Sequence, residues 1–213
     1  TLAIILGKMY HKPYSCHTAI YPNTSSTRGD IMTNKILICY RSATGFTKRY
    51  AEMIASELNC ALRNIKDITV DVISQYDIVV FGSRLHAGTV DGLKNIKSKI
   101  AQSGVKKFVI FATGAMPGTA SKDIQQVWEN NLTVDELHKI PHFYMPGGLC
   151  YEKMPLPDKI MMKAFAHVMK SRLKHKQNKT QEDRDFEQTI STSYDISSKE
   201  YIMPLVNSLK GDK

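Results

Sequence analysis

Residues 38–52 read ICYRSATGFTKRYAE, and this stretch decides the fold. An apolar run ends at a cluster of Ser, Thr and Gly, and apolar residues at helical spacing begin directly after it. A buried strand, a short polar loop and an amphipathic helix in this order are typical of the first part of a strand–helix–strand unit. The three hydroxyl groups and the single glycine at the junction suggest that the loop has a purpose beyond connecting the two elements.

Short apolar runs alternate with helical patterns along the rest of the chain. We expect buried strands at 36–40, 78–82 and 108–113, a weak strand at 61–65 and a glycine-rich strand at 143–149. Helices are expected at 46–59, 90–102, 119–138 and 197–209. Strands that are apolar throughout and alternate with amphipathic helices are typical of a parallel sheet covered on both faces. The sequence therefore predicts an α/β fold, a doubly wound five-stranded parallel sheet with helices on both faces.

Three loops of such a sheet are candidate binding loops, because ligands bind beyond the carboxyl ends of the strands where the strand order reverses. These loops follow the strands at 36–40, 78–82 and 108–113. The candidate site residues are Ser42, Ala43, Thr44, Gly45, Phe46 and Thr47 in the first loop, Ser83, Arg84, Leu85, His86, Ala87 and Gly88 in the second, and Thr113, Gly114, Ala115 and Met116 in the third.

The first of these loops has the composition of a phosphate site. Gly45 allows a tight turn and a close approach to a ligand, and Ser42, Thr44 and Thr47 offer hydroxyl donors. The start of the following helix adds backbone N–H groups that have no partner within the helix. The alternative is an ordinary helix N-cap, for which one hydroxyl would suffice. Three hydroxyls around a glycine favour the phosphate.

The phosphate loops of two common nucleotide-binding folds are absent. No Lys-Ser or Lys-Thr pair follows a second glycine, and no G-x-G-x-x-G follows the first strand. The pattern S-x-T-G-x-T at 42–47 instead resembles the FMN-phosphate loop of flavodoxins. The resemblance implies a flavodoxin-like fold with FMN as cofactor, the other two loops holding the isoalloxazine ring, and redox chemistry carried by the flavin. No protein side chain is assigned a catalytic role.

The second and third loops depart from many flavodoxins in one respect. They contain no Trp or Tyr to flank the flavin ring, and Leu85, His86 and Met116 are the nearest candidates for that position. Arg84 has two interpretations, a surface charge or a group that faces the flavin or an anionic substrate.

The formal net charge of +9 over 213 residues favours anionic partners over basic ones. Residues 159–179 contain no acid. On a helical wheel this segment places lysines on one side and apolar residues on the other, the latter being Met161, Met162, Ala164, Phe165, Val168 and Met169. Such a helix can make a peripheral contact with an anionic membrane or pack on the sheet with its lysines solvated. Nucleic acid is not expected as a partner, because the segment lacks interleaved aromatic residues.

A narrower resemblance is to the menaquinone-dependent protoporphyrinogen dehydrogenase family. It rests on the first loop at 42–47, a glycine-rich last strand at 146–151 and a basic, Met-rich helical insertion at about 152–190. It implies an oxidoreductase that passes electrons from a tetrapyrrole through FMN to a quinone. The alternatives are a soluble flavodoxin that exchanges electrons with a redox partner protein, and a binding module that has lost its flavin.

The remaining expectations concern organisation and location. We interpret residues 1–31 as a leader or tag, and 32–213 as one FMN-binding domain that contains the insertion. Four scattered cysteines without a C-x-x-C pair predict reduced thiols, no metal site and a cytoplasmic protein, with peripheral attachment to the inner face of the membrane as the alternative location.

Overall fold

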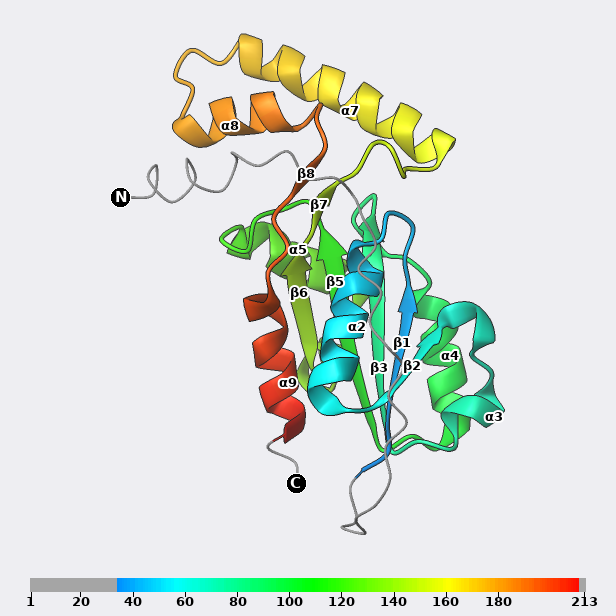
Figure 1. The fold of residues 1–213 in the computed structure, drawn as a ribbon. Coiled ribbons are helices and arrows are strands. Elements are labelled where there is room, and N and C mark those ends of the chain that lie inside the picture. The colour runs from blue at the N-terminus through cyan, green and yellow to red at the C-terminus, as the bar shows by residue number, and fades with distance from the viewer. Residues whose placement is uncertain (1–33, 211–213) are drawn as a thin grey trace.

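A computed structural model describes residues 34–210 and contains the expected parallel sheet (Figure 1). Its five parallel strands are β1 (Ile36–Arg41), β2 (Ala61–Asn64), β3 (Ile78–His86), β5 (Lys107–Gly114) and β6 (His142–Pro146). They are arranged in the order β2-β1-β3-β5-β6. The order reverses between β1 and β3, which makes the sheet doubly wound. The predicted fold class is confirmed.

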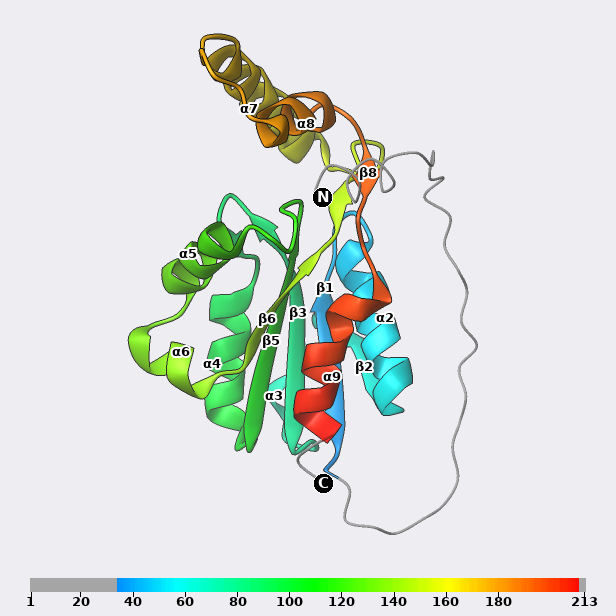
Figure 2. The same cartoon turned by 90° about the vertical axis from the view of Figure 1, so that its left-hand side faces the viewer.

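Helices cover both faces of the sheet, and each face has its own hydrophobic core (Figure 2). On one face, α2 (Phe46–Leu58) and α9 (Met203–Lys210) pack against the sheet through residues such as Ile54 and Leu205. On the other, the core includes α3 (Val70–Ile73), α4 (Leu93–Ser103) and α5 (Ser121–Asn131). The central strands are apolar throughout because side chains on both of their faces are buried.

The expected helix at 119–138 is two helices. α5 ends at Asn131, and α6 (Val134–Lys139) begins after Thr133. The Thr133 hydroxyl accepts from the Glu136 amide, and the Glu136 carboxylate accepts from the Thr133 amide, which makes a capping box. Helical spacing of the apolar residues continues across this break, so periodicity alone did not reveal it. The sequence also did not predict η1 (Ile65–Asp67) or α3.

The expected loop at 83–88 is a β-hairpin. β3 continues to His86 and pairs in antiparallel fashion with β4 (Thr89–Val90). The two turn residues, Ala87 and Gly88, both have positive φ, at 48° and 81°. Two-residue hairpin turns favour this backbone conformation because its twist matches that of the strands. The expected helix at 90–102 accordingly begins only at Leu93.

The expected last strand at 143–149 is divided. β6 ends at Pro146, and β7 (Gly148–Leu149) leaves the sheet to pair antiparallel with β8 (Tyr194–Asp195). Gly148 has a φ of +140°, and a Cβ atom there would lie 2.1 Å from the Tyr194 carbonyl oxygen. Glycine is therefore required where the two chain segments meet.

The β7–β8 pair carries two helices beyond the carboxyl ends of the strands, α7 (Leu156–Lys174) and α8 (Gln181–Thr189) (Figures 1 and 2). The segment 159–179 was expected to be helical, and α7 covers it only as far as Lys174 and begins earlier, at Leu156. After β8 the chain returns through η2 (Lys199–Ile202) to α9, so the helix expected at 197–209 begins as a 3₁₀ turn. The expectation for residues 1–31 lies outside the described residues. Within 34–210, no helix has the length and apolar content that crossing a membrane requires.

Candidate functional site

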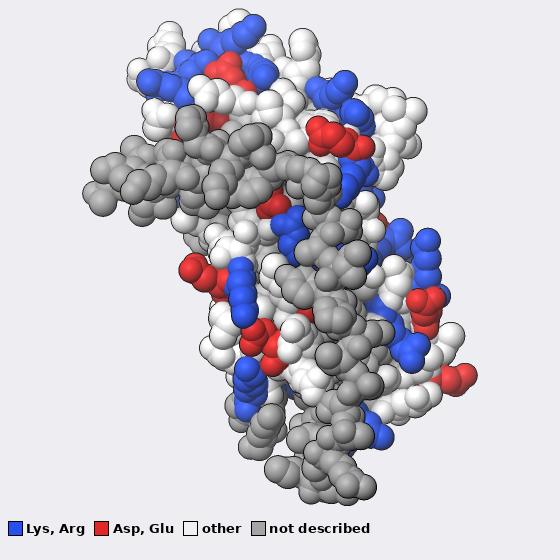
Figure 3. Space-filling view, in the orientation of Figure 1, with Lys and Arg blue, Asp and Glu red and all other residues white. Residues whose placement is uncertain are grey.

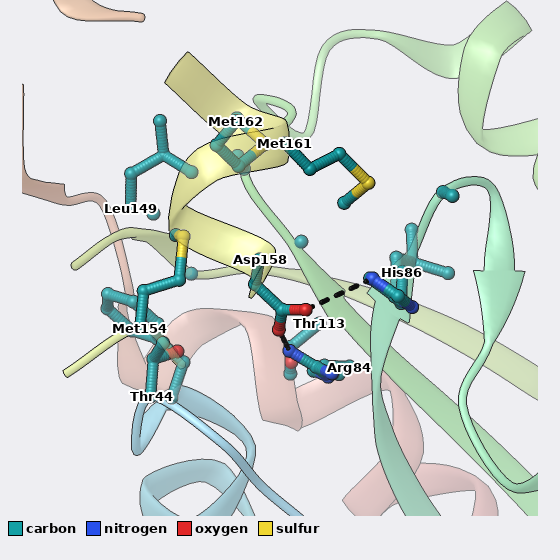
Figure 4. A pocket seen from close by; sticks show the side chains of 16 residues that line it. Thr44, Arg84, His86, Thr113, Leu149, Met154, Asp158, Met161 and Met162 are labelled. Carbon is teal, nitrogen blue, oxygen red and sulfur yellow. Dashed lines mark hydrogen bonds and ion pairs between the residues drawn. The ribbon is translucent and has the colours of Figure 1, made fainter. Parts of the chain in front are cut away.

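A pocket lies at the carboxyl edge of the sheet, and all three predicted loops reach it (Figure 4). The lining residues that the sequence predicted are Thr44, Phe46, Arg84, Leu85, His86, Ala87, Thr113, Gly114 and Ala115. They come from the β1–α2 loop, the β3–β4 hairpin and the end of β5. The parallel register of β1, β3 and β5 brings these segments together, because their carboxyl ends share one edge.

The β1–α2 loop presents backbone N–H groups rather than side chains alone. The first hydrogen bond of α2 runs from the Arg49 amide to the Gly45 carbonyl at 3.0 Å, so the amides of Phe46, Thr47 and Lys48 have no acceptor within the helix. The first turn of α2 contains no acidic residue, and no side chain caps it. Gly45 has a φ of +103°, and a Cβ atom there would meet nothing within 4 Å. The helix start is open to an anion, which its dipole also favours.

The hydroxyls of this loop are used differently from one another. Ser42 accepts a hydrogen bond from the Gly45 amide at 3.2 Å, which stabilises the turn. Thr44 lines the pocket. Thr47 is buried, and its Oγ1 lies 2.7 Å from Oγ1 of Thr113. One of these two hydroxyls donates to the other, so the pair keeps a single hydrogen for a further acceptor. The sequence analysis treated the Thr47 hydroxyl as a donor to a ligand. In the structure this hydroxyl instead bonds to Thr113 and joins the first loop to the third.

Charged side chains gather on the wall of the pocket formed by the β3–β4 hairpin. The Arg84 guanidinium forms an ion pair with Asp158 of α7, and its Nε lies 3.3 Å from Asp91 Oδ2. Nε2 of His86 lies 3.4 Å from the other oxygen of Asp158 (Figure 4). Arg84 therefore lines the pocket as a paired charge, and its contact with a flavin or an anionic substrate stays a prediction. Asp158 joins the first turn of α7 to the hairpin, and we call Arg84, His86 and Asp158 the latch.

Seven predicted residues lie around the pocket without lining it: Ser42, Ala43, Gly45, Thr47, Ser83, Gly88 and Met116. Several of them shape its walls. The buried Ser83 donates to the Asp91 carbonyl at 2.5 Å, across the base of the hairpin. The Met116 carbonyl accepts from the Tyr144 hydroxyl at 2.9 Å. Burial raises the pKa of Tyr144, so this hydroxyl keeps its proton and continues to donate.

Sequence reasoning missed seven lining residues: Gly147, Gly148, Leu149, Met154, Asp158, Met161 and Met162. The first three belong to the glycine-rich segment after β6, which the sequence analysis treated only as a strand. The other four belong to the insertion. Its methionines were noted as one side of an amphipathic helix, but nothing in their spacing shows that they reach the sheet edge. Leu85, His86 and the three methionines line the pocket, and no Trp or Tyr among the described residues does.

The pocket has one polar end and one apolar end. The open amides of α2 can bind an anionic group, and the apolar walls can hold a planar group beside Arg84 and His86. The enclosed space is about 160 Å³. That is below the range of about 300–1,000 Å³ for typical ligand pockets. The first turn of α7 lies over the pocket and limits this space (Figure 4). Among the described residues, no group of His, Cys, Asp and Glu side chains is arranged to hold a metal ion.

Comparisons with known proteins agree with this geometry. A family model described as a flavodoxin domain matches residues 37–178, more than half of the chain. An uncharacterized protein of Methanocaldococcus jannaschii is 35% identical over 85 residues, which are 39% of this chain and 56% of that protein. The chain thus spans about half the length of that curated relative.

Several solved structures are similar at low identity. A flavodoxin, WrbA-like protein of Agrobacterium tumefaciens is 19% identical, with 68% of this chain and 100% of that chain covered and a TM-score of 0.35. A flavoprotein of Lactobacillus acidophilus, solved in complex with FMN, is 19% identical, with 54% and 93% covered and a TM-score of 0.37. A Megasphaera elsdenii flavodoxin is 16% identical, with 57% and 89% covered and a TM-score of 0.38.

Proposed function

Since this chain belongs to the flavodoxin domain family, we propose that its pocket binds FMN and that the protein is a flavin-dependent redox protein. The observation that carries the proposal is the start of α2. Three backbone amides without an acceptor in the helix and the open Gly45 lie beside an apolar pocket, and Thr44 and Phe46 of the same segment line that pocket. Neutral donors of this kind suit a phosphate monoester, and the apolar end suits a planar ring.

The residues present fit both ends of FMN. The amides of Phe46, Thr47 and Lys48 would hold the phosphate, with the Thr44 hydroxyl as a further donor. Leu85, His86 and the residues from Thr113 to Ala115 would border the ring. FMN, when bound, supplies the electron or hydride transfer. Arg84 places a positive charge on the same wall, which favours electron-rich states of a neighbouring group, and Asp158 partly offsets that charge.

The first experiment is a titration of the purified protein with FMN, followed by flavin absorbance and fluorescence. Thr44→Val removes a donor without changing the size of the side chain, and we expect it to weaken FMN binding by about 1–3 kcal/mol. Thr192→Val is the matched control, because Thr192 is exposed and its hydroxyl bonds only to the nearby Thr189 carbonyl among the described residues. A protein that takes up no FMN, or a Thr44 variant with unchanged affinity, contradicts the assignment.

A narrower function is an oxidoreductase of the protoporphyrinogen dehydrogenase type that passes electrons to a quinone. The supporting observation is the methionine wall: Met154, Met161 and Met162 give the pocket an apolar side contributed by the insertion. Flexible thioether side chains suit contact with a large apolar reactant. A simple electron carrier has no need of such a wall.

Reduction of a menaquinone analogue by protoporphyrinogen, in the presence of the FMN-loaded protein, tests this assignment. Rapid reduction by a flavoprotein reductase without any activity toward quinone would instead identify a soluble electron carrier. If the protein takes up no flavin in either assay, the binding-module alternative replaces both.

A further inference from the structure

Three longitudinal faces of α7 differ in what they contact. The first is buried: Ala166 and Leu173 are inaccessible, and Met162 is half-buried beside them. Ala166 belongs to a small cluster with Leu149, Tyr151 and Ile190, which fixes α7 to the β7–β8 stem and to the end of α8. Together with the contacts of Asp158 and Met161 at the pocket, this face holds α7 in place.

The second face is apolar and exposed. Ile160, Phe165 and Val168 are 61%, 47% and 48% exposed, and Met161 lies among them. The alternative that the whole Met and Phe side of this helix packs on the sheet is therefore wrong for Phe165 and Val168. α7 contacts α8 and the pocket rim and leaves this face uncovered. Contiguous exposed apolar surface of this kind marks an interaction site.

The third face is basic and borders the second. Lys159, Lys163, Lys170 and Lys174 recur at spacings that place them along one side of the helix. Lys163 forms no ion pair with any carboxylate that the structure describes. Lys176 and Lys179, beyond the end of α7, are instead paired with Asp183 and Glu187 of α8. Figure 3 shows Lys and Arg gathered over this upper part of the molecule, with uncharged surface beside them.

We propose that α7 docks on an anionic membrane surface, with Ile160, Phe165 and Val168 in the interface and the lysines at the level of the headgroups. An apolar strip bordered on one side by lysines can lie in the plane of a bilayer, with the lysines at its polar edge. Attraction to anionic lipid adds to burial of the apolar strip, and α7 contains no acid after Asp158 to oppose it.

Docking in this way would also orient the pocket. Met161 lines the pocket and is itself 40% exposed, next to Phe165 on the following turn. The apolar strip is therefore continuous with the rim of the pocket. A reactant dissolved in the lipid would reach that rim without crossing water. Membrane docking needs no flavin, so its failure is distinguishable from failure of FMN binding.

Co-sedimentation of the full chain with two kinds of vesicle tests the proposal, with and without FMN. One kind is phosphatidylcholine alone, and the other is phosphatidylcholine with phosphatidylglycerol at three to one. We expect binding to the anionic vesicles only, and weaker binding as salt is added. Phe165→Ser with Val168→Ser should lower the partition constant at least about ten-fold through lost apolar burial. Lys163→Gln with Lys170→Gln should lower it about thirty-fold at low salt.

Val134→Ser is the matched control, because Val134 is 72% exposed on α6, away from α7, and should leave binding unchanged. Circular dichroism of each variant checks that the fold is intact. Three outcomes overturn the proposal: no binding to anionic vesicles at low salt, equal binding of the Phe165 and Val168 variant, or loss of binding in Val134→Ser. Retention of an acidic protein by this face in place of vesicles would assign it to a protein partner and also overturn the proposal.

Discussion

The sheet and the α7–α8 helices are built on different principles. The central strands of the sheet are buried on both faces, and large side chains such as Phe81 and Phe111 are inaccessible. α7 and α8 bury little: their shared cluster has four buried residues, while several large apolar side chains of α7 stay exposed. A shape held by apolar burial is fixed by the core, whereas a shape held by few contacts can respond to a partner.

Polar contacts compensate in part for the small core of the helical pair. Thr180 and Asp183 form a capping box at the start of α8, and Lys176 and Lys179 pair with carboxylates of α8. Exposed ion pairs stabilise by only about 0–1 kcal/mol each. The latch adds an ion pair between the helical pair and the sheet, in which Asp158 contacts Arg84 at the pocket. We infer that the helical pair opens at a lower free energy than the sheet unfolds.

The largest expected difference is in the free energy of unfolding, between a substitution at Phe111 in the sheet and one at Phe165 in α7. Phe111→Ala should destabilise the protein by about 3–5 kcal/mol, because it leaves a cavity between the strands and α2. Phe165→Ala should change the free energy of unfolding by less than about 0.5 kcal/mol, because that side chain is half exposed. Urea denaturation followed by Trp128 fluorescence measures both. Similar losses in the two variants would mean that Phe165 is covered in solution.

The next largest expected effect is on the free energy of opening of α7, when the ion pairs of the latch are removed. Asp158→Asn keeps the shape of the side chain but removes its charge, and we expect it to favour opening of α7 by about 1–2 kcal/mol. Hydrogen exchange should therefore accelerate in α7 and α8 and remain unchanged in β1, β3 and β5. Asp91→Asn is the comparison variant, because Asp91 pairs with Arg84 and Arg41 but does not touch α7. If exchange accelerated equally in the sheet and in the helices, α7 and α8 would open together with the sheet, which contradicts the prediction.

The sequence predicted the sheet well for the same physical reason that makes it stable. Strands buried on both faces need uninterrupted apolar runs, so their positions along the chain can be read from residues such as those at 78–82. The position of the β1–α2 loop was also predictable, since the chain direction places it at the carboxyl edge of the sheet. The β3–β4 hairpin was missed because Ala87 is not a residue that signals positive φ.

The other half of the pocket could not be predicted from the sequence. Asp158 and the methionines of α7 reach it because Gly148 redirects the chain onto the β7–β8 stem. That change of direction depends on a contact with Tyr194, far along the chain, for which local spacing gives no signal. The same holds for Thr47, whose hydroxyl is directed to Thr113 by the packing of α2 on β5.

The smallest expected effect is the loss of stability of α8 at low pH. Hydrogen bonds from the Lys176 side chain and the Thr180 amide lower the pKa of Asp183 from its usual value of 3.8 to about 2. A lowered pKa means that Asp183 stabilises the folded helix above about pH 4, and that this contribution is lost as the pH falls toward 2. Hydrogen-exchange protection of α8 should therefore decline over that interval while the protection of β5 declines less.

Asp183→Asn can still accept from the Thr180 amide but does not titrate, so it should flatten the decline in α8. Asp185→Asn, two residues further along α8, is the control and should leave the decline in α8 unchanged. An unchanged pH profile in the Asp183 variant would show that other carboxylates control the acid response of the helical pair.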